Sequence, residues 1–321
     1  MRNLALMWVL AGCLLGCGGG AQTWYCGPEK KLRAVKTTLK NGTLTVSGKG
    51  AMKDFLEPIG LIIEPWGRNQ DKSFEEIYDE SMKDGRAIHW PPWYFTFKYD
   101  TTILITDVVI EEGVTHIGDM AFACLPELKS VTISASVSSI GKEAFGLTGM
   151  GCCSHASSLT TITIAMDNTY YSSEDGILFN KNKTTLILYP RGRQQDTFTI
   201  PNSTITVGKD AFYYCKSLTS IIIPNNVTSI GKRAFAMCTN LTSITIPNSV
   251  KYIEKEAFEY CASLTSITVQ NPSPPKLGED AFRHIEENAC LYVPEGSEAA
   301  YSLVEELKEF NCIKPIASAP E

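Results

Sequence analysis

A repeat of 23 residues runs through the chain and constrains its fold more than any other feature. Two neighbouring copies, beginning at Ile223 and Ile246, read IPNNVTSIGKRAFAMCTNLTSITI and IPNSVKYIEKEAFEYCASLTSITV. Aliphatic, aromatic and thiol positions all recur at this interval: Ile200, Ile223, Ile246 and Val269; Phe212, Phe235 and Phe258; Cys215, Cys238 and Cys261. A period of this length predicts a solenoid, in which one short unit stacks on its copies.

Each repeat predicts a short strand followed by a return path that faces the same core. In Leu241–Ile246, Ile244 and Ile246 alternate with Thr245, which is typical of a strand that buries every second side chain. Pro247 ends this strand, and the rest of the unit has the apolar spacing of an irregular or short helical path. Because one coil cannot bury its own apolar face, we expect a parallel sheet, a spine of phenylalanines and a ladder of reduced cysteines.

The repeat resembles the BspA-type leucine-rich repeat. The resemblance rests on the pattern Leu-x-x-Ile-x-Ile and on the run Ile-Pro-Asn-x-Val-Thr-Ser-Ile-Gly-Lys-x-Ala-Phe, and it covers residues 100–316. It implies an α/β fold leaning to β, a solenoid of about eight coils with a parallel sheet on one face, an N-terminal β cap and a C-terminal helical cap. The family is common among surface and secreted bacterial proteins, so the resemblance implies adhesion to host matrix or to other cells.

The repeat and its interruptions predict the domain organisation. We expect a lipoprotein signal peptide at 1–16, a tether at 17–23, an N-terminal cap at 24–106 with an aromatic and helical insertion at 57–99, repeats at 107–294 with a hairpin insertion at about 165–199, and a C-terminal cap helix and tail at 295–321. The cap helix should begin at Ser297 and carry one apolar face: Tyr301, Val304, Leu307 and Phe310.

The first residues predict export. The apolar stretch Leu4–Leu15 is too short to cross a bilayer and is typical of a signal peptide. The tetrapeptide ending at Cys17, Leu-Leu-Gly-Cys, resembles a bacterial lipobox and implies that Cys17 is lipidated. Lipidation at Cys13 and plain cleavage after Ala21 remain open. We therefore expect a cell-envelope protein, an outer-membrane lipoprotein on the surface or periplasmic side, with secretion as the alternative.

Composition and motifs argue against several classes of function. A net charge of −6 disfavours a nucleic-acid partner. No catalytic or phosphate-binding motif occurs, so we expect no enzyme activity and no cofactor. The cluster Cys152-Cys153-Ser154-His155 offers at most three metal ligands, and adjacent cysteines seldom bind one zinc together, so we expect no metal site.

Two sets of residues are candidates for ligand binding. The outward strand positions form an expected ladder of exposed side chains: Thr132, Thr163, Ile222, Thr245 and Thr268. The insertion carries an aromatic cluster: Trp90, Trp93 and Tyr94. The leading hypothesis is protein–protein interaction; the alternatives are carbohydrate binding by the aromatic cluster and a structural envelope protein without a specific ligand. We expect specificity to lie where the repeat is interrupted, and pairing among Cys26, Cys290 and Cys312 is left open.

Overall fold

The computed structural model describes residues 22–25, 34–53, 105–123, 125–146, 158–308 and 310–318, the first of these ranges by its backbone alone. The chain divides into two compact units, each described separately below. Unit 1 comprises Met1–Ser158 and Ile164–Tyr170, and unit 2 comprises Leu159–Thr163 and Tyr171–Glu321.

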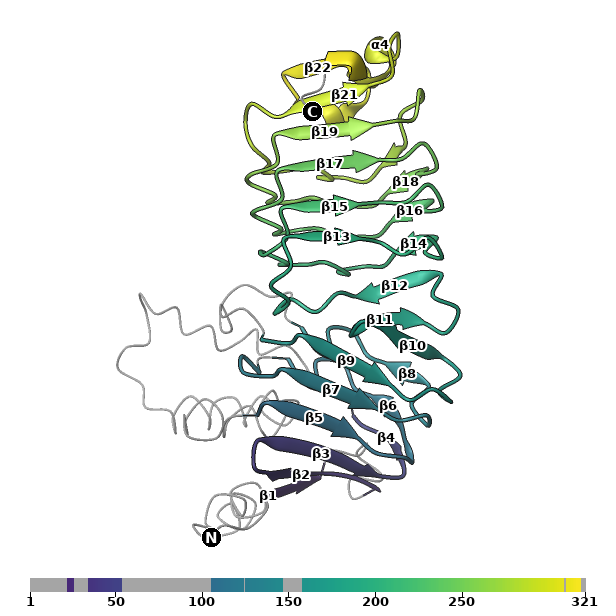
Figure 1. The fold of residues 1–321 in the computed structure, drawn as a ribbon, viewed down its shortest axis with the longest axis vertical. Coiled ribbons are helices and arrows are strands. Elements are labelled where there is room, and N and C mark those ends of the chain that lie inside the picture. Colours follow the sequence, from purple (N-terminus) through teal and green to yellow (C-terminus); the bar gives the residue numbers. More distant parts are fainter. Residues whose placement is uncertain are drawn as a thin grey trace, which may run out of the picture. The chain divides into compact units, whose positions relative to one another are not determined.

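Unit 1 begins with an antiparallel cap and continues as parallel coils (Figure 1). Its larger sheet has the order β1-β2-β3-β5-β7, with β1 (Gln22–Tyr25), β2 (Val35–Lys40), β3 (Thr43–Gly48), β5 (Asp107–Ile110) and β7 (Ser130–Ile133). The next strand of this sheet, β9 (Thr161–Ile164), has residues in both units. Strands β1 to β3 pair antiparallel, whereas β3 pairs in parallel with β5 and β5 with β7. A second sheet contains β4 (Gly50–Ala51), β6 (Val114–Ile117) and β8 (Ser139–Ile140). The expected N-terminal β cap is confirmed.

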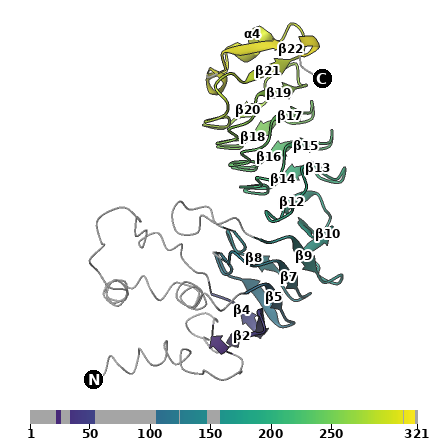
Figure 2. The ribbon, with the colours of Figure 1, turned by 60° about the vertical axis from the view of Figure 1, so that its left-hand side comes forward.

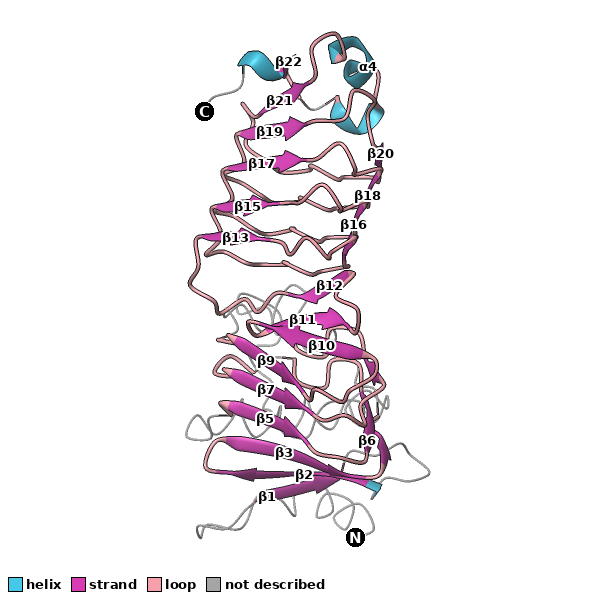
Figure 3. Ribbon diagram, turned by 45° about the vertical axis from the view of Figure 1, so that its right-hand side comes forward, coloured by secondary structure: helices cyan, strands magenta, loops and turns pink. Residues whose placement is uncertain are grey.

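Unit 2 contains two sheets on different sides of its coils (Figure 3). The long-strand sheet consists of β13 (Thr197–Thr199), β15 (Ser220–Ile222), β17 (Ser243–Ile246), β19 (Ser266–Val269), β21 (Cys290–Val293) and β22 (Cys312–Pro315), all parallel. The short-strand sheet consists of β10 (Tyr171–Glu174), β11 (Ile177–Asn180), β12 (Thr185–Leu188), β14 (Thr206–Val207), β16 (Ser229–Ile230), β18 (Tyr252–Ile253) and β20 (Lys276–Leu277). The long-strand sheet is the expected one, and the short-strand sheet is an addition to it.

The third side of each coil in unit 2, here called the turn side, is a run of tight turns. Two non-glycine residues per coil have a φ between 53° and 64°: Asp210 and Tyr214, Arg233 and Met237, Glu256 and Tyr260, Asp280 and His284. Between them, the Phe212 N–H donates to the Ala234 carbonyl at 2.7 Å, and the Phe235 N–H donates to the Ala257 carbonyl at 2.8 Å. The return path is therefore a third hydrogen-bonded ladder rather than a helix.

A stack of aromatic rings fills the core of unit 2. The rings of Phe212, Phe235, Phe258 and Phe282 follow one another at centroid distances of 5.0, 5.1 and 5.1 Å. Tyr189 extends the stack at one end. The spine expected from the sequence is confirmed, and it is longer than the strict 23-residue spacing indicated, because Phe282 follows Phe258 by 24 residues.

The cysteine ladder is also confirmed. Cys215, Cys238 and Cys261 are unpaired thiols in the core. Two of the sulfur atoms donate to carbonyls of the preceding coil, from Cys238 to Phe212 at 3.1 Å and from Cys261 to Phe235 at 3.2 Å. Burial raises the pKa of Cys238 from 9.0 to about 12, so the thiol stays protonated at neutral pH.

The insertion between Ile164 and Ile200 is an antiparallel meander built into the short-strand sheet. Strand β10 pairs with β11, and β11 pairs with β12, both antiparallel. Strand β12 then pairs in parallel with β14, and β14 with β16. The hairpin expected here is thus continuous with the sheet of the repeats, as the run from β10 to β20 shows in Figure 2.

The C-terminal cap contains less helix than expected. Helix α4 (Glu298–Ser302) is followed by the 3₁₀ helix η4 (Glu305–Leu307), strand β22 and the 3₁₀ helix η5 (Ile316–Ser318). The expected single helix from Ser297 to Phe310 is interrupted because Val304 is extended, with φ −79° and ψ 123°. Its apolar residues still cover the core, since Tyr301, Leu307 and Phe310 are buried.

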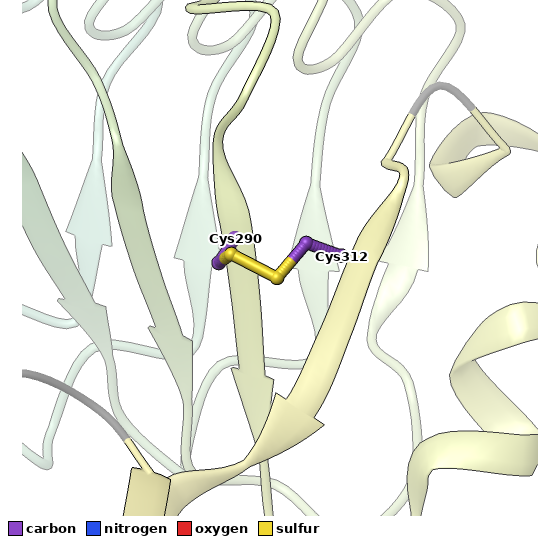
Figure 4. Close-up of a disulfide and its surroundings, with 2 residues drawn as sticks. All are labelled: Cys290 and Cys312. Atoms are coloured by element: carbon purple, nitrogen blue, oxygen red, sulfur yellow. A yellow bond between two sulfur atoms is a disulfide. The ribbon is translucent and has the colours of Figure 1, made fainter.

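A disulfide closes the last coil. Cys290 on β21 bonds to Cys312 on β22, with their Cα atoms 4.7 Å apart, which answers the pairing question for these two cysteines (Figure 4). The two residues are register partners in the parallel pair. Closing a loop of this size is worth about 3 kcal/mol in the chain-entropy model, so the disulfide holds the terminal strand on the stack.

Candidate functional site: two outer faces of the repeats

The five side chains of the expected binding ladder belong to two sheets. Thr132 lies on β7 and Thr163 on β9, whereas Ile222, Thr245 and Thr268 lie on β15, β17 and β19. The sheet that contains β7 and β9 is separate from the long-strand sheet, which contains β15, β17 and β19. The ladder is interrupted because the meander β10–β12 lies between these strands in the chain. The structure therefore brings together three of the five residues.

Those three residues form one straight column on the outer face of the long-strand sheet. Ile222 is the register partner of Thr245, and Thr245 is the partner of Thr268. Ile222 is 60% exposed and is the large apolar residue of this column that faces solvent. At the end of the column Thr268 is paired with Tyr292. The column therefore repeats in register from strand to strand, with threonine at two of its three positions.

A second column of hydroxyls runs beside the first. Ser220, Ser243 and Ser266 are register partners on successive strands. Within the described part of the chain, the hydroxyls of these serines and of Thr245 make no side-chain hydrogen bond, although nearby Thr242 donates to the Thr219 carbonyl at 3.3 Å. The outer face therefore has hydroxyl groups available to a ligand, whereas the hydroxyls at the edge of the coil are used internally.

The turn side of the same coils is chemically varied, and sequence reasoning missed it. Counted from the core phenylalanine of each coil, the second residue is in turn Tyr214, Met237, Tyr260 and His284. All four have positive φ. Tyr260 is 44% exposed, and its ring stacks on that of His284 at 4.4 Å. We call this column the aromatic stripe.

Cations lie against the tyrosines at the first coil of the stripe. The Lys216 ammonium is 4.1 Å from the centre of the Tyr214 ring, and the guanidinium groups of Arg191 and Arg233 are 5.0 and 5.4 Å from the centre of the Tyr213 ring. Such contacts are worth about 0.5–1 kcal/mol at exposed sites. Burial raises the pKa of the Tyr213 phenol, and the two guanidinium groups oppose that shift, so the phenol stays neutral at physiological pH.

Charge changes sign along the turn side. Basic residues gather at the first two coils: Arg191, Lys209, Lys216, Lys232 and Arg233. Acidic residues gather at the next two coils: Glu256, Glu259, Glu279, Asp280, Glu286 and Glu287. Opposite charges also lie in each half, and many of these charges pair within the molecule: Lys209 and Arg233 with Asp210, Lys232 and Lys255 with Glu256, Lys255 with Glu279, and Arg283 with Asp280. Burial, followed by the nearby Glu256 charge, raises the pKa of the Glu259 carboxyl.

One feature of the sequence could have indicated the turn side: the residues at one fixed place in the repeat vary from coil to coil. The two residues between the core Phe and the core Cys differ from coil to coil, reading Tyr213-Tyr214, Ala236-Met237 and Glu259-Tyr260. Sequence alone could not show that the second residue of each pair lies at least partly exposed on the turn side, because periodic spacing does not reveal left-handed backbone turns.

Several predicted sites lie outside the described residues: lipidation at Cys17, the aromatic cluster of Trp90, Trp93 and Tyr94, the cysteines at 152 and 153, and Cys26. Among the residues that the structure does describe, no group of three or more His, Cys, Asp or Glu side chains could hold a metal ion. In the same part of the chain, no helix is both long and apolar enough to cross a membrane.

The stacked coils, their parallel strands and their aromatic spine define a repeat protein of the β-solenoid class; the residues that the structure describes form about nine turns and contain little helix. The family model described as "BspA type Leucine rich repeat region" matches residues 95–185 and 191–299 in six copies. The chain belongs to this family. No curated protein matches the chain.

Solved structures of bacterial leucine-rich repeat proteins are similar to the chain at low identity. The pneumococcal vaccine antigen PcpA is 21% identical over 65% of this chain, with a TM-score of 0.46, and the match spans 61% of that protein, less than two thirds of its length. A leucine-rich repeat protein from Eubacterium ventriosum is 20% identical, with 92% of this chain and 94% of that one covered and a TM-score of 0.34. A leucine-rich cell surface protein from Faecalibacterium prausnitzii is 22% identical, with 68% and 61% covered and a TM-score of 0.39.

Proposed function

We propose that the chain is a non-catalytic binding protein of the cell envelope that uses the outer face of its long-strand sheet for protein–protein interaction. The observation that carries this proposal is the in-register exposed column of Ile222, Thr245 and Thr268, with a parallel column of serine hydroxyls beside it. Membership of the BspA-type repeat family supports a role in interaction or adhesion. Host matrix proteins and neighbouring cells are the partners we propose.

The chain would reach this position through its N-terminal leader, with lipid attached to Cys17. Protease treatment of intact cells tests the location. Loss of the protein from intact cells is the expected result, whereas protection until the outer membrane is broken would place it inside and contradict host adhesion.

A pair of matched substitutions tests the binding face. Thr245→Lys adds a bulky charge to the centre of the long-strand face, and Tyr252→Lys adds the same charge to the short-strand sheet, where Tyr252 is 53% exposed. Binding to a panel of immobilised matrix proteins and to intact bacterial cells should fall roughly tenfold or more for Thr245→Lys and stay unchanged for Tyr252→Lys. Equal binding by both variants and the parent chain would reject the long-strand face as the site.

A further inference from the structure

The aromatic stripe is maintained at a cost to the backbone. Tyr214, Met237, Tyr260 and His284 have φ values of 64°, 62°, 58° and 57°, a conformation in which an L side chain is strained. Glycine or asparagine would adopt it more easily. The stripe does not build the core, which the Phe and Cys ladders fill. The turn itself requires a left-handed residue, since each coil has a second one, at Asp210, Arg233, Glu256 and Asp280. What the stripe offers a partner is its side chains, which are exposed at Tyr260 and His284 and half-buried at Tyr214 and Met237.

The turn side is straight enough to act as one surface. The planes of successive spine rings differ by 15°, 8° and 2° from Phe212 to Phe282. The backbone is also in register from coil to coil: the N–H groups of Tyr214, Met237 and Tyr260 donate to carbonyls of the next coil, those of Ala236, Glu259 and Arg283, at 2.9, 2.8 and 2.9 Å. A side chain at a given place in one coil therefore has a counterpart about 5 Å further on in the next.

The charges of this surface would complement those of a second copy of the same surface that runs in the opposite direction. The first two coils are mainly basic and the next two mainly acidic. An acidic polymer would match only the basic coils, and a basic partner only the acidic ones. A second copy of the same surface, running in the opposite direction, matches both.

We propose that the turn side of unit 2 binds the turn side of a second copy of this chain, antiparallel, about a two-fold axis between the second and third coils. This inference goes beyond the proposed function, which concerns a different surface of the same coils, the outer face of the long-strand sheet.

The repeat fixes which residues would meet. An antiparallel pair places each position of the first coil opposite the same position of the fourth. Lys216, the fourth residue after Phe212, then faces the partner's Glu286, the fourth residue after Phe282.

At the centre of the stripe, the second and third coils would meet. Met237 would lie against the partner's Tyr260, a thioether against an aromatic ring, which is a favourable contact. The surface spans only four coils, about 15 Å from the first to the fourth, so we expect it to bury less than the roughly 800 Å² per partner of a standard interface. The dimer should therefore be weak and should depend on low salt, because exposed charge pairs are screened.

Sedimentation equilibrium of the full-length chain, with Cys17→Ser to prevent lipidation, tests the proposal. At low salt and rising concentration the average mass should climb towards that of a dimer. Lys216→Glu alone and Glu286→Lys alone should keep the chain monomeric. The double variant, which restores an opposite-charge pair in the reversed sense, should recover dimer formation.

Lys276→Glu, which reverses a charge on the short-strand sheet, is the matched control and should dimerise like the parent chain. A parent chain that stays monomeric at every concentration would overturn the proposal, as would a double variant that fails to recover. Binding of an acidic polysaccharide that depends on Lys216, by a chain that stays monomeric, would also overturn it and assign the basic coils to an anionic ligand. None of these outcomes depends on the long-strand face, so the proposed function stands or fails separately.

Discussion

The long-strand face and the turn side belong to the same coils, share the same 23-residue repeat and cover the same aromatic spine, yet their chemistry differs. The long-strand face repeats serine at one position and mainly threonine at another. The turn side changes its residue in every coil, from Tyr214 to Met237 to Tyr260, and its charge reverses along the stack. The long-strand face thus repeats both backbone and side chains, whereas the turn side repeats the backbone conformation with different side chains.

This difference teaches that a regular repeat does not imply a uniform surface. We expected specificity where the repeat is interrupted, at 57–99, 146–158 and 165–199. Within unit 2, varied chemistry also lies inside the repeat, at two positions between the core Phe and the core Cys. The hydrogen-bonded turn ladder fixes the backbone there, so the side chains are free to vary without altering the fold.

The largest loss of stability should come from a cavity in the core that both faces share. Phe235 is fully buried between two stacked rings. Phe235→Ala should lower the free energy of unfolding by about 3–5 kcal/mol, measured by urea denaturation, and both the partner binding and the self-association should weaken together. Phe235→Leu, which keeps most of the volume, should cost less than half as much. A variant that lost one face and kept the other would show that the two faces do not share one core.

A smaller loss of stability should appear at alkaline pH, because the buried thiols of the core resist ionisation in the folded chain. Burial holds the pKa of Cys238 at about 12 in the folded chain, against 9.0 for an exposed thiol. The unfolded chain therefore loses this proton first as the pH rises. Stability should be unaffected below pH 9 and should fall between pH 9 and 12, by up to about 1.4 kcal/mol per pH unit for each such thiol.

Urea denaturation of the parent chain and of Cys238→Ala, from pH 8 to pH 10.5, measures this slope. The variant should be less stable at pH 8 but should lose stability less steeply above pH 9. Equal slopes for both proteins would mean that Cys238 does not keep its proton in the folded state.

The smallest effect should be a gain in stability on the turn side. Met237 has a φ of 62° and lies partly exposed in the stripe. Met237→Asn should relieve left-handed strain and raise the free energy of unfolding by up to about 1 kcal/mol, while weakening self-association. Thermal unfolding measures the gain, with Ala236→Gly beside it as a control that removes a buried methyl group and should destabilise. A loss of stability in Met237→Asn would mean that the side chain serves the fold rather than a partner.

Much of the core could be predicted from sequence. Repeated Ile, Phe and Cys positions at constant spacing predicted the long strands, the ring spine and the reduced thiols, because core positions admit few alternatives. A hairpin was predicted at about 165–199, and the structure has the antiparallel strands β11 and β12 there, on either side of the polar residues Lys181 to Thr184, with β10 as an additional third strand.

The remainder could not be predicted, for physical reasons. Strands of two residues, such as Ser229–Ile230, are too short to show alternation, so the short-strand sheet was missed. The break at Val304 in the cap is invisible to helical periodicity, since its apolar spacing continues through Phe310. The aromatic stripe depends on the sign of φ, which residue type does not reveal when Tyr, Met and His occupy left-handed positions.

The most direct test of the account compares one charge on each face in a single sedimentation experiment. Lys216→Glu and Thr245→Glu place the same carboxylate on the turn side and on the long-strand face of unit 2. At low salt, Thr245→Glu should dimerise like the parent chain, and Lys216→Glu should remain a monomer. Dimer formation by Lys216→Glu, with its loss in Thr245→Glu, would contradict the division of roles between the two faces.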